Sequence, residues 1–72
     1  MKFDTHGNGN GLDDLYILPE NMEEKVKVVY FLMGKHWNFY YSQSNVEGNE
    51  WYGKTFIDVP FGESLKKEIE YL

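Results

Sequence analysis

The chain lacks three residue types entirely: its 72 residues include no cysteine, no arginine and no alanine. Without cysteine it can form no disulfide, no thiolate metal site and no thiol nucleophile. Without arginine it has no planar fork for carboxylates or phosphates, and its positive charge comes from lysine alone. A hydrophobic content of 42% still predicts one small folded domain held together by an apolar core.

Long apolar runs are also missing. The longest spans residues 28–33, which is far shorter than the roughly 20 residues that cross a bilayer. The first seven residues have no apolar core of the kind found in signal peptides. From these features we expect a cytoplasmic protein that does not contact a membrane.

Positive charge is scarce, with 7 basic residues against 12 acidic ones. Residues 1–24 carry the entire net charge of −5, and the rest of the chain is balanced. Such a chain cannot replace the counterions of DNA or RNA, so we expect no direct nucleic-acid binding and, if anything, a basic partner surface. The candidate acidic patch consists of Asp13, Asp14, Glu20, Glu23 and Glu24.

Residues 1–14 are rich in glycine and asparagine and lack an apolar period, which predicts a flexible acidic arm before a domain at residues 15–72. Asp4, Asn8 and Gly9 match part of a calcium-binding loop. The position that needs a bidentate glutamate is Leu15, and His6 occupies another ligand position. We therefore expect no metal site and no cofactor.

Residues 20–33 fit two structures. Asn21 followed by Glu24 is typical of a helix start, and the apolar residues from Met22 to Met33 include a set at helical spacing. Against this, the run from Val26 to Phe31 is dense in strand-forming residues. Gly34-Lys35 is also typical of a two-residue hairpin turn.

The register of such a hairpin favours the strand interpretation. Pairing residues 27–33 with residues 36–42 gathers only apolar and aromatic side chains on one face. That face consists of Val28, Tyr30, Leu32, Trp37, Phe39 and Tyr41. The other face is mixed and includes the candidate partner-binding residues Val29, Phe31, Met33, Asn38 and Tyr40.

The remaining elements complete an α+β fold. Residues 15–18 predict a first short strand, residues 51–59 alternate as another strand, and residues 63–72 carry a helical apolar stripe. We expect a three- to four-stranded antiparallel sheet with one C-terminal α-helix packed on one face. The predicted core consists of Val28, Tyr30, Leu32, Trp37, Phe39, Tyr41, Ile57, Val59, Leu65 and Ile69.

One ten-residue helix covers only one face of such a sheet, so the mixed face is left as a surplus apolar surface. Two interpretations are open: another protein covers it, or the N-terminal segment with Leu12, Leu15 and Ile17 folds over it. The three serines and two threonines lie in no nucleophile pattern, so we expect no catalytic residues and no enzyme.

Size, acidity and aromatic content are typical of phage or mobile-element inhibitors and of immunity proteins. The sequence thus predicts a small non-enzymatic module that binds and modulates another protein. The alternatives are an acidic mimic of nucleic acid that blocks a basic, nucleic-acid-binding enzyme, and a homodimer or other homo-oligomeric structural module.

Overall fold

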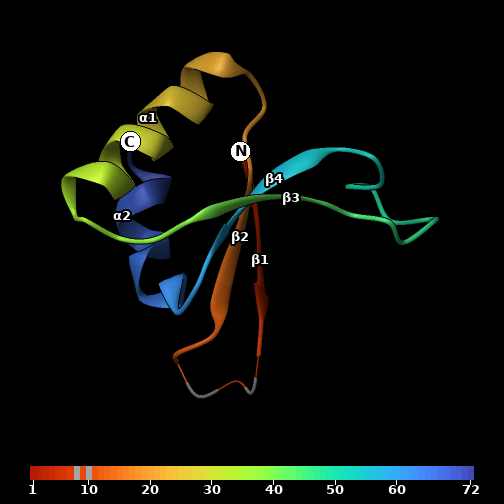
Figure 1. Ribbon diagram of the computed structural model, residues 1–72, viewed down its shortest axis with the longest axis horizontal. Helices are drawn as coiled ribbons and strands as arrows, with labels where there is room; N and C mark the ends of the chain where they lie inside the picture. Colours follow the sequence, from red (N-terminus) through yellow and green to blue (C-terminus); the bar gives the residue numbers. More distant parts are fainter. Residues whose placement is uncertain (8, 10) are drawn as a thin grey trace.

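The computed structural model describes residues 1–7, 9 and 11–72, which form one antiparallel sheet and two α-helices (Figure 1). The strands are β1 (Lys2–His6), β2 (Asp14–Leu18), β3 (Tyr40–Gln43) and β4 (Thr55–Val59), in the sheet order β1-β2-β4-β3. Helix α1 (Met22–Gly34) joins β2 to β3, and a 3-10 turn, η1 (Gly62–Leu65), leads into α2 (Lys66–Glu70). The expected α+β class and antiparallel sheet are confirmed.

The hairpin predicted around Gly34-Lys35 is wrong, because residues 22–34 form α1, and the domain therefore has more than one helix. Asn21 Oδ1 accepts a hydrogen bond from the Glu24 amide at 2.9 Å, and this bond satisfies a donor that a helix start leaves free. Glu24 Oε1 accepts a second bond from the Glu20 amide at 2.8 Å. Gly34 does not have the positive φ that the predicted turn requires.

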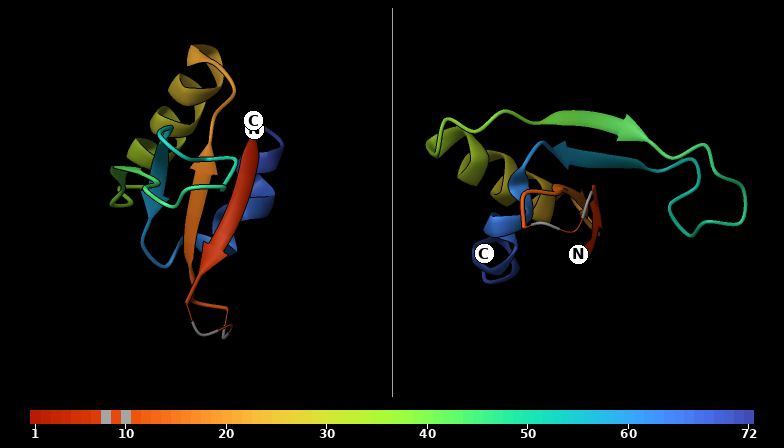
Figure 2. Two further views of the ribbon diagram at one scale, coloured as in Figure 1. Left: turned by 90° about the vertical axis from the view of Figure 1, so that its right-hand side faces the viewer. Right: turned by 90° about the horizontal axis from the view of Figure 1, so that it is seen from below.

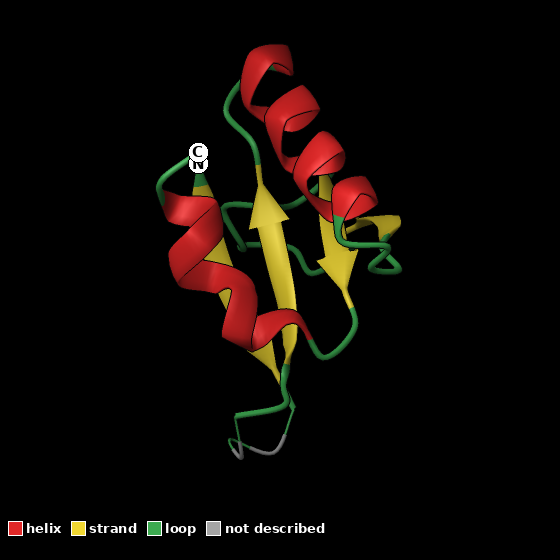
Figure 3. Cartoon of the chain, turned by 90° about the vertical axis from the view of Figure 1, so that its left-hand side faces the viewer, coloured by secondary structure: helices red, strands yellow, loops and turns green. Residues whose placement is uncertain are grey.

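Both helices cover the same face of the sheet (Figure 3). The side chains of β2 and β4 alternate between the two faces, as strand geometry requires. Leu15 and Ile17 point from β2 into the core under the helices, and Ile57 and Val59 do so from β4. The helical side closes the core with Val28, Leu32, Leu65 and Ile69.

The predicted core is partly correct. Six of its members are buried: Val28, Leu32, Ile57, Val59, Leu65 and Ile69. Trp37 and Phe39 are half-buried and pack against the core, and the Trp37 indole N–H donates to the Pro60 carbonyl at 3.0 Å. Tyr30 and Tyr41 are exposed, so their assignment to the core is wrong. The fully buried Leu15 and Ile17 were not in the predicted core, because their short run did not reveal that β2 is a central strand.

The described glycines of the N-terminal segment, Gly7, Gly9 and Gly11, lie between β1 and β2. Lys2–His6, part of the segment predicted to be a flexible arm, forms the edge strand β1 and pairs with β2 over its whole length. Asp13 is buried and accepts hydrogen bonds from the Gly9 amide at 3.0 and 3.1 Å. The flexibility of residues 1–14, and their separation from a domain at 15–72, stay predictions.

At the opposite edge of the sheet, β3 and β4 form a hairpin that extends beyond the helices (Figure 2). Their connection, residues 44–54, bends back toward the sheet and is anchored by Trp51. This segment lies on the face of the sheet that the helices leave free, and it frames the site described next.

Candidate functional site

The residues predicted to bind a partner do not share one face. Val29 and Phe31 lie on α1 and pack against the core, half-buried, whereas Met33 on the same helix is exposed. Asn38 lies in the connection to β3, and Tyr40 lies exposed on β3 itself. The mixed hairpin face on which these residues were grouped does not exist, because α1 replaces its first strand.

The five residues of the predicted acidic patch form two groups at opposite ends of β2. Asp13 and Asp14 lie at its start, where Asp14 Oδ1 accepts a hydrogen bond from the Phe61 amide at 3.0 Å. Glu20, Glu23 and Glu24 follow its end. The hydrogen bond from the Glu20 amide lowers the pKa of Glu24, which also pairs with the N-terminal ammonium at 3.2 Å.

Four side chains on the helix-free face form a row across all four strands. Strand pairing places Asp4 opposite Tyr16, Tyr16 opposite Asp58, and Asp58 opposite Tyr40. Directly opposite residues share a face, so acids and tyrosines alternate along this acid–tyrosine row. His6 stacks on Tyr16 with ring centroids 4.5 Å apart, and its Nε2 lies 3.6 Å from Asp4 Oδ2.

The electrostatics of the row favour an incoming cation. Burial, followed by the negative charge of Asp14, raises the pKa of Asp58, and His6 only partly opposes this shift. Burial and the surrounding carboxylates, with Asp58 foremost, likewise raise the pKa of the Tyr16 hydroxyl. Asp58 Oδ1 is buried and accepts no hydrogen bond from the residues that the structure describes. Within the described part of the chain, no lysine forms an ion pair with Asp14 or Asp58.

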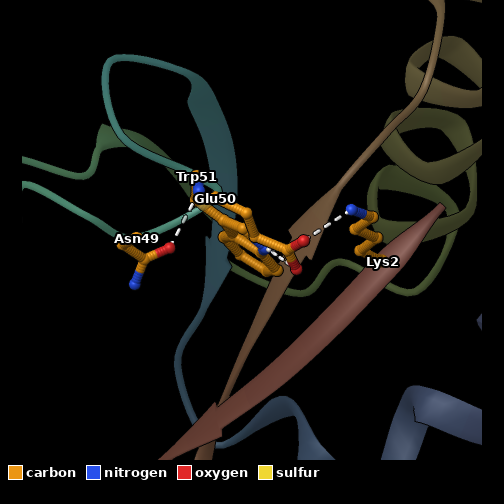
Figure 4. A network of polar contacts seen from close by, with 4 residues as sticks. All are labelled: Lys2, Asn49, Glu50 and Trp51. Atoms are coloured by element: carbon orange, nitrogen blue, oxygen red, sulfur yellow. Dashed lines mark hydrogen bonds and ion pairs between the residues drawn. The ribbon is translucent and has the colours of Figure 1, made fainter.

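Trp51 anchors the 44–54 segment beside this row. Its indole packs in a small second cluster with Leu18 and Phe56, and Tyr16 lies against that cluster. The neighbouring Glu50 accepts a hydrogen bond from Lys2 on β1 at 2.8 Å, which lowers the pKa of Glu50 (Figure 4). Asn49 Oδ1 accepts from the Trp51 amide at 2.8 Å. The segment is thus attached by an apolar anchor and an exposed ion pair.

A pocket of about 470 Å³ opens between the 44–54 segment and the β1–β2 end of the row. One wall carries Asp4, His6 and Tyr16, and the other carries Val46, Glu50 and Trp51. Its chemistry is therefore acidic and aromatic. The side chains of Asp4 and His6 are each 59% exposed, so water reaches both freely.

Metal ligation finds no support in the described residues, where no three histidine or carboxylate side chains are placed to hold an ion. The partial calcium pattern included Asn8, which lies outside the described residues together with Asn10. A separate finding is that none of the described helices is long and apolar enough to cross a membrane.

Sequence reasoning missed Tyr16 and Asp58 as site residues. The available signal was parity: Leu15 and Ile17 alternate with Tyr16, and Ile57 and Val59 alternate with Asp58. When β2 and β4 pair, the polar residues that alternate with the buried ones in each strand lie together on the helix-free face. The alternation within each strand does not predict which strands pair.

Comparison of the chain with protein-family models, with curated proteins and with solved structures gives no match.

Proposed function

We propose that the protein is a small, non-enzymatic module that binds and modulates another protein through the helix-free face of its sheet. The observation that carries the proposal is the acid–tyrosine row, in which Asp58 lies between Tyr16 and Tyr40 and, among the described residues, forms no ion pair with a lysine. A lysine or arginine side chain of a partner would meet carboxylates and tyrosine rings together, which suits both ion pairing and cation–π contact.

The composition of the face supports protein binding. Tyrosine is enriched in protein interfaces because its ring offers apolar area with a polar tip and few rotatable bonds. The net charge of −5 favours approach to a basic surface.

The test is affinity capture from cell lysate by the wild-type chain and by Tyr40→Ser, quantified by mass spectrometry. Tyr40 is exposed at the end of the row, so the substitution removes contact area without opening the core. We expect a protein with a basic surface to be retained by the wild type and lost at least tenfold with Tyr40→Ser. The matched control is Tyr71→Ser, which alters an exposed tyrosine in another part of the molecule.

A defined probe complements the capture. In an amide NMR titration, a tri-lysine peptide should shift the signals of Tyr16, Tyr40 and Asp58, whereas a tri-glutamate peptide should leave them unchanged. Equal capture by wild type and Tyr40→Ser, or lysine-induced shifts confined to other parts of the chain, would overturn the proposal.

A further inference from the structure

Helix α1 carries a second apolar stripe that does not face the core. Met22, Val26, Tyr30 and Met33 are spaced by four, four and three residues, so they lie along one side of the helix. Their exposed fractions are 66%, 41%, 71% and 57%. The buried side of the same helix is formed by Val28 and Leu32.

The stripe is large for a domain of this size. Four such side chains expose on the order of 450 Å² of apolar surface, the size of the largest apolar patch on a typical monomer, and such patches are often functional. The surface continues past Met22 into a shallow groove shared with Lys25 and Tyr41, and Tyr41 is itself half exposed. The outer stripe of α1 thus extends to the edge strand β3.

We infer that a second copy of this chain covers the outer stripe, with the two α1 helices packed antiparallel about a two-fold axis. Such an interface must be complementary to itself. The stripe has this property: antiparallel pairing centred between Val26 and Tyr30 places the small valine of each copy against the large tyrosine of the other. It also places Met22 against Met33.

Charged side chains near the stripe are already paired within the chain, which suits an uncharged, apolar surface such as the stripe of a second copy. Glu23 lies 3.7 Å from Lys27. Lys35, the C-cap of α1, lies 3.3 Å from Glu68 on α2. The helix dipoles favour the antiparallel orientation, because the positive start of each helix then lies beside the negative end of the other.

The dimer leaves the proposed binding face free. The helices cover one face of the sheet (Figure 3), and the acid–tyrosine row lies on the other. Pairing through α1 therefore turns the two rows outward. The inference does not depend on the proposed function. Where both hold, the dimer presents two binding faces and gains avidity for a partner with two sites.

The direct test is sedimentation equilibrium of the full chain over a wide concentration range. Two copies would bury on the order of 1,000 Å², at the lower end of specific interfaces, so we expect a weak dimer whose population rises with protein concentration. The mass should rise from 8.5 kDa to twice that value. Tyr30→Ser should weaken the dimer at least tenfold, and Tyr71→Ser should not.

The orientation has its own test, because the chain contains no cysteine of its own. In an antiparallel dimer Met22 of one copy meets Met33 of the other, whereas the two Met22 residues lie about 16 Å apart along the helices. A mixture of Met22→Cys and Met33→Cys should therefore form a disulfide under mild oxidation, and either variant alone should not. A mass that stays at 8.5 kDa at millimolar concentration, or cross-linking of Met22→Cys with itself, would overturn the inference.

Discussion

Replacing Trp51 with alanine tests whether the 44–54 segment is anchored on the sheet. Trp51 is only 8% exposed and packs with Leu18 and Phe56. A tryptophan side chain buries about 150–250 Å². At about 25 cal/mol per Å², the lost burial amounts to about 4–6 kcal/mol as an upper bound.

The measured cost should be smaller, because the released segment recovers conformational entropy. Each backbone residue that becomes free returns about 1–2 kcal/mol, so freeing two residues already returns about half of the lost burial energy. We therefore expect Trp51→Ala to lower the free energy of unfolding by about 2–3 kcal/mol. That is a large fraction of the stability of a domain this small.

Urea unfolding followed by fluorescence is a suitable assay, because Trp37 remains as the single tryptophan in the variant. Trp37 packs half-buried against the core, so its fluorescence reports global unfolding. Tyr52→Ala is the matched control, since Tyr52 is the next residue in the same segment and is 52% exposed. If Trp51→Ala lowers the free energy of unfolding no more than Tyr52→Ala does, Trp51 does not anchor the 44–54 segment. The pocket would then lose the support for the wall that this segment forms.

Three further substitutions test the fold and its electrostatics. Gly34→Ala should stabilise the protein by about 0.5–1 kcal/mol in urea unfolding, because alanine favours a helix more than glycine does and no atom lies near the added methyl group. Destabilisation would contradict the assignment of Gly34 to α1. Gly62→Ala should cost about 1–3 kcal/mol, because its Cβ would lie 2.5 Å from Val59 Cγ1; an unchanged melting temperature would contradict that packing. Asp58→Asn should raise the melting temperature at pH 7. Burial raises the pKa of Asp58, so the wild type loses stability as pH increases through the range where this carboxyl ionises. The gain should shrink at about pH 3, where Asp58 is protonated in both the folded and unfolded states. A gain of equal size at both pH values would show that ionisation is not its cause.

The wrong hairpin prediction comes from the unbroken apolar run at residues 28–33. This run fits the periodicity of a strand and of a helix equally well. Almost any hairpin register would therefore have placed apolar side chains together on one face, so the register did not discriminate between the two structures. The decisive information lay outside that run, in the capping bonds of Asn21 and Glu24 at the start of α1. Helix and sheet compete as whole elements, and a cap that satisfies free amides outweighs the modest strand preference of valine.

The two surfaces differ in how far the sequence predicts them. The outer stripe of α1 follows from helical spacing as soon as the helix is known, because Met22, Val26, Tyr30 and Met33 are local in the chain. The acid–tyrosine row joins residues up to 54 positions apart and depends on β2 pairing with β4 rather than with β3. Alternation predicts which side of a strand is polar, but only the strand order decides which polar sides meet. A sequence change that alters the strand order would therefore remove the site, even if Tyr16 and Asp58 kept their positions in the alternation of their own strands.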